Sequence, residues 1–389
     1  MRGSIQLLGP RRWRLVFDIG RDQSGKRRQK VVNFRGNKRD AEKELARLIA
    51  EFENGGFVEP NKLTVASYLM RWLHDHAEMR ISPKSAERYR EICEKHIVPA
   101  LGSHRLAKLQ PMHIQEYYAE ALRSGRRDGK GGLAARTVLH HHRVLRQALQ
   151  QAIRWLLLSR NPADAVDPPR PNRREILVPD EQQTARLING AKGSSLFIPV
   201  LLAACAGIRR GEALAVRWSD LDENRGTLSV VRSLEQTAAG VRFKGPKTER
   251  GRRVVTLPSI ALDALREHRV NQAELRLRLG LGRGDGGLIC AGEDGTPRSP
   301  RAFSKSFKRL AKKLNMPGIT FHSLRHGHAT QLLRSGIHPK IAQERLGHST
   351  IATTLDLYSH CTPDMQEDAA VRTDAVIRAA LEKRKGNGD

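Results

Sequence analysis

The feature of this chain that most limits its fold is a segment dense in proline and charge, NPADAVDPPRPNRRE, at residues 161–175. Proline lacks a backbone N–H and fixes φ, so such a run can neither continue a helix nor pair in the middle of a sheet. We interpret it as a linker between separately folded parts. A length of 389 residues also favours two or three domains over a single core.

Before the linker, from about residue 63 to 165, the chain shows helical periodicity and predicts an all-α domain. Four segments carry the pattern, at 64–77, 82–102, 110–125 and 133–158. In the last segment an apolar stripe is formed by Val138, Leu145, Leu149, Ala152, Ile153 and Leu156. The opposite face carries Arg136, His140, Arg143, Gln147, Gln150 and Arg154.

A helix face of Arg, Gln and His side chains is typical of a helix that reads the DNA major groove, because these side chains reach phosphates and purine edges. An ordinary solvent-facing helix gives the same pattern and remains the alternative. The candidate DNA-binding residues are Arg136, His140, Arg143, Gln147 and Arg154. The run of histidines at 140–142 does not indicate a metal site, since adjacent positions diverge around a helix, and His142 is expected to be packed.

The first 60 residues predict a small module of three strands and one helix. Strands are expected at 4–8, 12–19 and 28–34 with a hairpin turn at 20–26, followed by a helix over 38–56 that a glycine pair closes. Residues 1–39 hold 12 Lys and Arg against 2 Asp and Glu, whereas residues 40–60 hold 2 against 6. The sheet is therefore the side expected to face an anion, with a solvated basic face as the alternative.

After the linker, residues 175–361 predict a mixed α+β domain. Helices are expected at 180–191, 196–207, 211–218, 259–279, 299–315 and 321–336, and strands at 226–233, 240–245 and 252–258. The glycine-rich stretch 280–287 follows a helix rather than a strand, which excludes a dinucleotide-binding fingerprint. Residues 362–389 form a tail whose amphipathic stretch 365–385 is expected to pack on a neighbouring molecule. The fold class is therefore multidomain, mainly α with small β-sheets.

The charge balance indicates a polyanionic partner. The formal net charge is +28 and the isoelectric point is near 10.8, which favours nucleic acid, with ribosomal or membrane-surface proteins as the alternatives. The four cysteines are scattered without a CxxC pair, which argues against a zinc cluster and a disulfide framework. We find no signal peptide, and the longest apolar run, 196–207, is too short for a bilayer. We expect a DNA-associated protein of the bacterial cytoplasm that does not interact with membranes.

The stretch LGHSTIATTLDLYSH, residues 346–360, places Tyr358 close to two histidines. Breaking a DNA strand without water requires a side-chain nucleophile, cations that stabilise the charged phosphate, and a proton donor for the leaving oxygen. A tyrosine becomes a competent phenolate only beside such cations, and forked arginines suit the phosphate oxygens.

The C-terminal domain contains such a set of residues. AGIRRGEAL places Arg209 at a turn between helices, with Glu212 able to hold its guanidinium. KTERGRRVVTLP places Lys247 on a hairpin, and FHSLRH places His322 and Arg325 on one helix face. His348 lies in LGHS. A zinc site at His322 and His326 is disfavoured, since the sequence has neither HExxH nor a nearby cysteine pair.

In this order and at these spacings the residues resemble the tyrosine recombinase (phage integrase) family, whose signature is an Arg, a hairpin Lys, a His-x-x-Arg, a His or Trp, and a Tyr. FHSLRH and LGHSTIATTLDLYSH look like its most recognisable blocks. The resemblance covers nearly the whole chain. Residues 1–60 look like the arm-type DNA-binding module, 63–165 like the SAM-like core-binding domain and 175–361 like the catalytic domain.

The resemblance implies specific chemistry. Tyr358 attacks the phosphodiester and forms a 3′-phosphotyrosine, while Lys247 protonates the leaving 5′-oxygen. Arg209 and Arg325 hold the non-bridging oxygens, and Glu212 supports them from behind. His322 is implied as the general base, and His348 as a hydrogen-bond partner of the phosphate. Lys244 lies three residues from Lys247, and the hairpin register decides between the two.

The family resemblance also implies the partners. No metal or nucleotide cofactor is expected, because the protein–DNA ester conserves the bond energy. The expected partners are double-stranded DNA with core-type and arm-type sites, three further copies in a homo-tetramer, and accessory DNA-bending or directionality proteins. We therefore predict a site-specific recombinase, an integrase of a phage or other mobile element. The alternatives are a type IB topoisomerase-like enzyme and a non-catalytic DNA-binding regulator.

Overall fold

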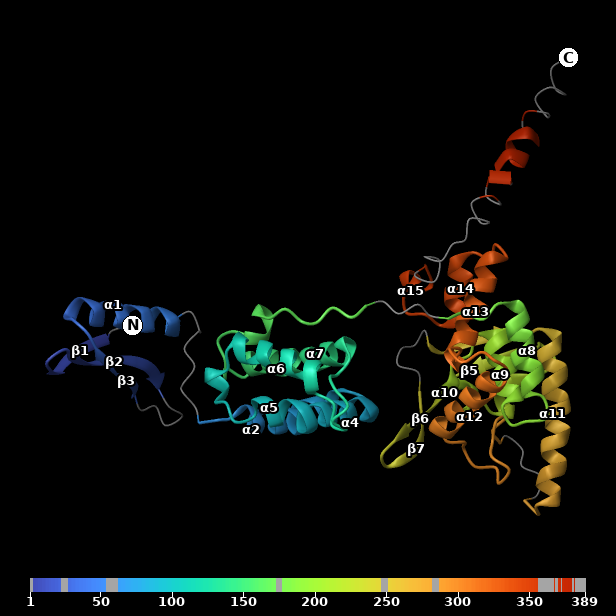
Figure 1. Ribbon diagram of the computed structural model, residues 1–389, viewed down its shortest axis with the longest axis horizontal. Coiled ribbons are helices and arrows are strands. Elements are labelled where there is room, and N and C mark those ends of the chain that lie inside the picture. Colours follow the sequence, from blue (N-terminus) through green and yellow to red (C-terminus); the bar gives the residue numbers. More distant parts are fainter. Residues whose placement is uncertain are drawn as a thin grey trace. The chain divides into compact units, whose positions relative to one another are not determined.

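The computed structural model describes residues 3–21, 27–53, 62–172, 177–245, 251–281 and 287–355, together with 367, 370, 371, 373–379 and 381 in the tail. The chain divides into two compact units, Met1–Arg173 and Arg174–Asp389, here called the N-terminal and C-terminal units. Each is described by itself. Figure 1 traces the elements along the chain.

The N-terminal unit begins with the predicted module. Strands β1 (Gly3–Gly9), β2 (Arg12–Arg21) and β3 (Arg27–Arg35) form an antiparallel sheet in that order, and α1 (Lys38–Glu53) covers one face (Figure 1). Alternation along β2 buries Leu15 and Phe17 against α1 and leaves Arg12 and Arg14 exposed. The predicted strands and helix are confirmed, while most of the 20–26 turn and the glycine pair Gly55–Gly56 lie outside the described residues.

The rest of this unit is the predicted all-helical domain. Two of the predicted helices are each broken by one π-helical turn, at Leu73–Ala77 and Cys93–Ile97. The helices are α2 (Val65–Trp72), α3 (Glu78–Arg80), α4 (Pro83–Ile92), α5 (Val98–Leu101), α6 (Pro111–Ser124) and α7 (Ala135–Arg154). Their apolar faces meet in one core that is separate from the core of the sheet module.

Helix α7 confirms most of the predicted pattern. Val138, Leu145, Leu149 and Ala152 are buried, but Leu156 is 74% exposed because the helix ends at Arg154 and Leu156 adopts a positive φ. The prediction for Leu156 was therefore wrong. His142 is packed as expected, with the Tyr118 hydroxyl 2.9 Å from its Nδ1.

The linker is shorter than the sequence indicated. Its first residues form a 3₁₀ turn at Pro162–Ala165, and Pro162 and Ala163 are buried in the helical core. The Asn161 side chain donates to the Arg146 carbonyl oxygen at 3.0 Å, and Asp164 pairs with Arg146 at 2.6 Å. The proline-rich run thus leaves the helical domain only after this turn.

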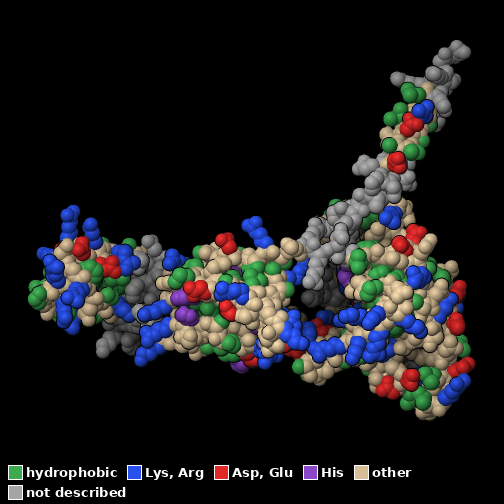
Figure 2. All heavy atoms as spheres, in the orientation of Figure 1, with side chains coloured by type: hydrophobic (Ala, Val, Ile, Leu, Met, Phe, Trp, Pro, Cys, Tyr) green, Lys and Arg blue, Asp and Glu red, His purple; other side chains and the backbone are tan. Residues whose placement is uncertain are grey.

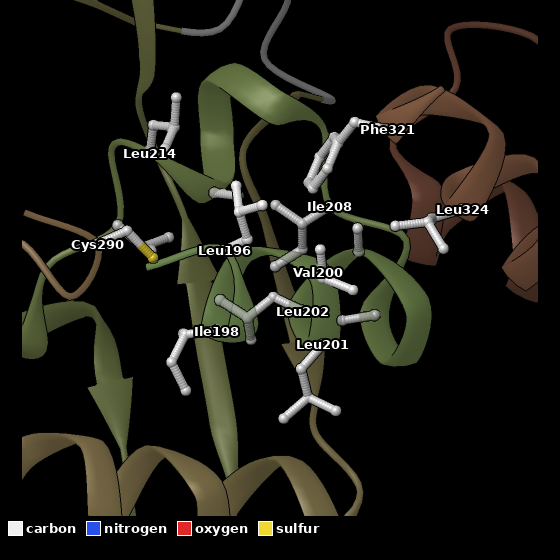
Figure 3. Close-up of a cluster of buried hydrophobic side chains, with 14 of the residues drawn as sticks. Leu196, Ile198, Val200, Leu201, Leu202, Ile208, Leu214, Cys290, Phe321 and Leu324 are labelled. Carbon is white, nitrogen blue, oxygen red and sulfur yellow. The ribbon is translucent and has the colours of Figure 1, made fainter. Parts of the chain in front are cut away.

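The C-terminal unit is built around a helix that is buried along nearly its whole length, α9 (Phe197–Ala206) (Figure 3). Packed against it are α8 (Glu181–Ala191), α10 (Arg210–Ala213), α11 (Ser259–Arg278) and α13 (Phe321–Arg334). The other helices of the unit are α12 (Pro300–Lys313), α14 (Pro339–Leu346) and α15 (Ile351–Leu355). One antiparallel sheet has the order β4 (Leu221–Asp222), β5 (Thr227–Val230), β8 (Arg253–Thr256). A separate hairpin pairs β6 (Ser233–Thr237) with β7 (Gly240–Lys244).

Several local predictions differ from this unit. The helix expected over 211–218 is a single turn, α10, after which residues 214–217 lead to a 3₁₀ turn at Trp218–Asp220. The strand expected over 226–233 ends at Val230, and Ser233 begins β6. Helices α14 and α15 were not predicted. The described part of the chain contains no helix with the length and hydropathy that a membrane crossing needs.

Candidate functional site

The first predicted arginine lies where α9 ends. The helix terminates at Gly207, whose φ of +62° is the left-handed conformation that glycine adopts without strain. A Cβ at this position would lie 2.5 Å from Leu346 Cδ2 and 2.9 Å from His328 Cδ2. The bare backbone lets α14 approach the end of α9, and two residues later the chain places Arg209 beside the end of α14.

Arg209 is held from two sides. Its Nη1 donates to Glu212 Oε1 and its Nη2 to the carbonyl oxygen of Gly347, both at 2.8 Å. Its backbone N–H donates to Glu212 Oε2 at 3.0 Å, which caps α10. The side chain remains 37% exposed, so the guanidinium is fixed in place and still reachable from solvent. The predicted contact with Glu212 is confirmed.

Arg325 comes from α13 and is buried in the same place. Its Nη1 donates to the Gly207 carbonyl oxygen at 2.6 Å and its Nη2 to the Leu346 carbonyl oxygen at 2.7 Å. Both acceptors belong to helix C-termini, where unpaired carbonyls and the helix dipole favour a cation. Burial lowers the pKa of the Arg325 guanidinium, and the charges of Arg209 and Arg253 lower it further.

The two arginines therefore bind consecutive carbonyl groups, those of Leu346 and Gly347. Because α14 ends at Gly347 with a φ of +64°, its last carbonyls point into the cluster. The pairing brings together residues that lie more than a hundred positions apart in the sequence.

Glu212 is the shared carboxylate of the cluster. Its second partner is Arg253 of β8, whose Nη2 donates to Glu212 Oε2 at 2.8 Å. Burial opposes ionisation of Glu212, but the hydrogen bond and charge of Arg253, together with the charge of Arg209, outweigh burial and hold its pKa at about 2. Sequence reasoning missed Arg253, although it stands in the same GRRVV stretch that follows the predicted hairpin lysine.

Three histidines lie in the field of these arginines. His322 and His326, one turn apart on α13, contact edge to face with ring centroids 4.6 Å apart. His322 keeps contact with solvent, yet the surrounding protein desolvates it enough, helped by His326, Arg325 and Arg209, to lower its pKa to about 4. Desolvation, followed by Arg325 and Arg209, likewise lowers the pKa of His348 to about 4.

His348 is oriented by a residue that the sequence reasoning also missed. Its Nδ1 lies 2.9 Å from the Thr354 hydroxyl, and Thr354 is completely buried on α15. When the hydroxyl donates to Nδ1, the Nε2 of His348 carries the ring proton and can donate to an anion.

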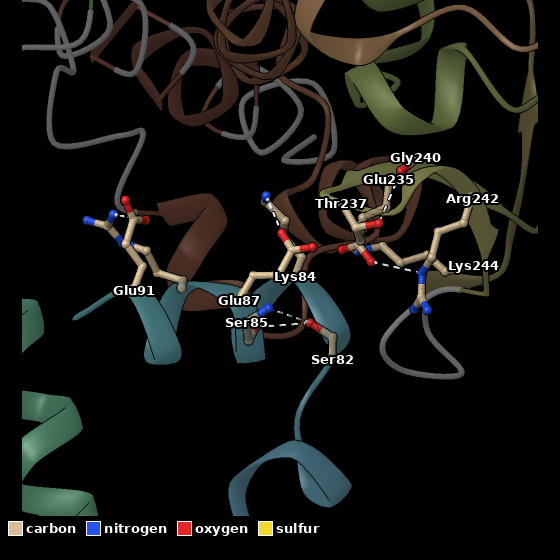
Figure 4. A network of polar contacts seen from close by, with 11 residues as sticks. Ser82, Lys84, Ser85, Glu87, Glu91, Glu235, Thr237, Gly240, Arg242 and Lys244 are labelled. Carbon is tan, nitrogen blue, oxygen red and sulfur yellow. Dashed lines mark hydrogen bonds and ion pairs between the residues drawn. The ribbon is translucent and has the colours of Figure 1, made fainter. Parts of the chain in front are cut away.

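Of the two lysine candidates and the tyrosine, only Lys244 lies within the described residues. Lys244, at the end of β7, pairs with Glu235 of β6, and Glu235 also contacts Arg242 at 3.3 Å (Figure 4). Lys247 lies outside the described residues, as does Tyr358, which is three residues beyond the end of α15 at Leu355. The described site therefore contains Arg209, Glu212, His322, Arg325 and His348 of the predicted set.

The predicted groove face of α7 is solvent-exposed. Arg136, His140, Arg143, Gln147 and Arg154 are all exposed, and Gln147 accepts a hydrogen bond from the Tyr89 hydroxyl at 3.0 Å. A second basic surface, which the sequence reasoning did not single out, lies on α12. Figure 2 shows Lys and Arg side chains gathered over this helix. Its exposed cations are Arg301, Lys305, Lys308, Arg309, Lys312 and Lys313.

No group of three or more His, Cys, Asp or Glu side chains in the described part of the chain is arranged to hold a metal ion. His322 and His326 thus have no third ligand of these types beside them in the described residues. What the described site offers is instead a set of fixed cations and neutral imidazoles that reaches solvent through Arg209 and His322, which suits a phosphate ester.

Comparison with known proteins supports the same interpretation. Residues 180–365 match the model of the phage integrase family, and residues 64–122 match that of the SAM-like N-terminal domain of phage integrases. A tyrosine recombinase XerC-like protein of Caldanaerobacter subterraneus subsp. tengcongensis is 27% identical over 381 residues, which cover 93% of this chain and 95% of that protein.

Two solved structures share the fold. The transposon Tn1549 integrase in complex with a circular intermediate DNA has a TM-score of 0.65 at 20% identity, covering 80% of this chain and 99% of that one. The lambda integrase tetramer bound to a Holliday junction has a TM-score of 0.53 at 21% identity, covering 90% of this chain and 96% of that one.

Proposed function

Because this chain belongs to the tyrosine recombinase (phage integrase) family and is a site-specific DNA recombinase, we propose that Tyr358 is its nucleophile and forms a covalent 3′-phosphotyrosine with DNA. The observation that carries the proposal is the placement of Arg209 and Arg325 on the consecutive carbonyls of Leu346 and Gly347. These carbonyls lie about a dozen residues before Tyr358 in the chain, so the cation pair is anchored on the stretch of sequence that leads to the nucleophile.

In the proposed cleavage step the phenol oxygen of Tyr358 forms a bond to phosphorus while the bond from phosphorus to the 5′-oxygen breaks. Arg209 and Arg325 stabilise the charge that develops on the non-bridging oxygens. His322 takes the phenol proton. With a pKa of about 4 its imidazole is neutral at pH 7 and therefore able to accept a proton.

The remaining groups complete the proton balance. Lys247 gives a proton to the leaving 5′-oxygen, and the reverse transfers accompany religation. Lys244 is the weaker candidate, because its ammonium group is already paired with the buried carboxylate of Glu235. His348 donates through Nε2 to a phosphate oxygen, with Thr354 fixing its ring. Glu212 orients Arg209. No step in this scheme calls for a metal or a nucleotide.

We further propose a division of labour along the chain. Residues 1–60 bind arm-type DNA through the sheet face that carries Arg12 and Arg14, and 63–165 bind core-type DNA with the exposed face of α7. Residues 175–361 carry out cleavage, with the cations of α12 contacting the DNA backbone. The tail 362–389 contacts a neighbouring copy in a tetramer, and its described residues Val371, Val376 and Ile377 expose apolar side chains.

The arm module favours an integrase of a phage or other mobile element, because a protein that binds two DNA sites gains avidity when both are engaged. We expect it to act on bacterial DNA, assisted by DNA-bending or directionality proteins.

A nicked suicide substrate tests the proposed chemistry. Wild-type protein should become trapped on the DNA as a covalent adduct, and Tyr358→Phe should form none. An adduct with Tyr358→Phe would refute the nucleophile assignment, and no adduct with wild type would favour a non-catalytic regulator. Relaxation of supercoiled DNA that lacks any attachment site would favour the topoisomerase-like alternative.

A further inference from the structure

The side chain that connects the parts of the site is Arg253, the first residue of β8. Its side chain is only 5% exposed, although it carries a charge. Nη2 and Nη1 donate to the two oxygens of Glu212, at 2.8 and 3.3 Å. Nε donates to the carbonyl oxygen of Arg345 at 2.8 Å. All three nitrogens of the guanidinium are therefore engaged in fixed directions.

Each acceptor of Arg253 leads directly to one of the arginines that face the phosphate. Glu212 holds Arg209 at 2.8 Å. The Arg345 carbonyl immediately precedes the carbonyls of Leu346 and Gly347, which hold Arg325 and Arg209. A Cβ at Gly347 would lie 3.1 Å from Arg253 Cδ, so the side chain packs directly under that turn.

Arg253 also begins the strand that follows the segment with Lys247, which lies outside the described residues. Its backbone is fixed by pairing with Val230 of β5, which belongs to the sheet of the core. The side chain thus joins three parts of the chain: strand β8, the turn that carries Arg209, and the end of α14. Arg209 also contacts Glu212 and the Gly347 carbonyl oxygen, but its side chain is 37% exposed, whereas that of Arg253 is 5% exposed.

We propose that Arg253 is a positioning residue for DNA cleavage, which sets Arg209 and Arg325 at the distance that a phosphate needs by holding Glu212 and the end of α14 together. The inference rests on the proposed function. The Arg253 side chain is only 5% exposed and each of its three guanidinium nitrogens donates to a protein oxygen, so it supports the site from behind and does not contact the phosphate. Its removal should affect the cleavage rate through the geometry of the pair, because displacements of about 1 Å can cost about 100-fold in rate.

The test uses the full-length protein and compares Arg253→Gln, Arg253→Lys and a matched control, Arg232→Gln. Arg232 pairs with the buried carboxylate of Asp220 at 2.7 Å in the same unit, outside the cluster formed by Arg209, Glu212 and Arg253. Cleavage is measured as the single-turnover rate of adduct formation on the suicide substrate at saturating DNA, and affinity is measured separately. Arg253→Gln should cleave about 10- to 100-fold more slowly at unchanged affinity.

Arg253→Lys should be intermediate, because one ammonium group can replace part of the bonding to Glu212 or Arg345 but not all of it. If Arg253→Gln does not fold, the Lys variant carries the comparison. Arg232→Gln should lose thermal stability like Arg253→Gln yet cleave at the wild-type rate. Cleavage by the Arg253 variants at the rate of Arg232→Gln would overturn the inference.

A second substrate separates positioning from general damage. A methylphosphonate at the scissile position lacks one charged oxygen and so depends less on aligned arginines. The deficit of Arg253→Gln, relative to wild type, should shrink on this substrate, as it should for Arg209→Ala. An undiminished deficit would assign Arg253 to folding alone. If the wild-type protein forms no adduct at all, the proposed function fails. If Arg253→Gln forms the adduct at the wild-type rate, only this inference is refuted.

Discussion

The most informative single substitution in the site is Glu212→Gln, because one buried carboxylate serves both Arg209 and Arg253. Its pKa falls from 4.5 to about 2 in the folded protein. At about 1.4 kcal/mol per pH unit, this lowering of the pKa corresponds to roughly 3–4 kcal/mol of stabilisation of the charged form at neutral pH. Glutamine keeps the shape but not the charge, and it leaves two arginines without their counter-ion.

The expected result is a loss of about 3 kcal/mol in the unfolding free energy of the C-terminal unit. For a unit of this size that lowers the melting midpoint by about 6–12 °C, which calorimetry of the full-length protein can resolve. The sign with pH is fixed by the lowered pKa: the wild-type advantage is present above pH 4.5 and disappears as the pH falls towards 2. Adduct formation should slow as well, since Arg209 loses its anchor.

Asp220→Asn is the matched control, because Asp220 is another carboxylate paired with an arginine, Arg232, at 2.7 Å and lies outside the cluster. It should lose stability without slowing adduct formation. If Glu212→Gln melts within about 1 °C of wild type and cleaves normally, the charge of Glu212 does not hold the site, and the electrostatic reasoning is wrong.

Three further predictions follow from other parts of the chain. Burial lowers the pKa of the fully buried His141 to about 4, so the stability of the helical domain should fall as the pH drops from 6.5 towards 4, by up to about 3 kcal/mol. Urea titrations at several pH values check this, and an equally steep loss in His141→Gln would contradict it. Gly207→Ala should slow adduct formation and cost at least about 1–2 kcal/mol, because its Cβ would lie 2.5 Å from Leu346 Cδ2 at a positive φ; a normal melting curve would exclude that clash. DNA affinity should fall steeply with salt, and Arg143→Gln should reduce the slope of log K against log salt by about one, whereas an unchanged slope would remove Arg143 from the interface.

The sequence was sufficient to predict secondary structure and burial where the pattern that determines them is local. Period-two alternation identified β2, and apolar spacing identified α7 and the buried side of His142. It failed where a tertiary contact determines the local structure. The helix expected over 211–218 is one turn long, and its Glu212 is buried between Arg209 and Arg253, residues that its own sequence pattern does not reveal as a set. The short helices α14 and α15 have too few residues to show a clear period.

The site shows the same division. The types and order of its residues were readable from the sequence, because Arg209, His322, Arg325 and His348 stand in compact motifs. Their supports were not readable, since three of the acceptors are backbone carbonyls, of Gly207, Leu346 and Gly347, and carbonyls leave no trace in residue identity. Arg253 contacts Glu212 and Thr354 contacts His348 only once the chain has folded, so no spacing in the sequence reveals these two contacts.

The charges of the described cluster explain why such supports are needed. Arg209 and Arg253 bind the carboxylate of Glu212, Arg325 lies in the field of all three, and Arg345 lies in the field of Arg253, so these like charges repel one another. The C-terminal ends of α9 and α14 each contribute about half a negative charge. At the end of α9 the carbonyl oxygens of Gly207 and Cys205 accept from Arg325 and Arg345, and at the end of α14 that of Gly347 accepts from Arg209. One carboxylate and two helix ends together offset about half of the four positive charges. The remainder is a net positive charge of about two, and the single negative charge of a phosphodiester that binds beside the partly exposed Arg209 would offset about half of it.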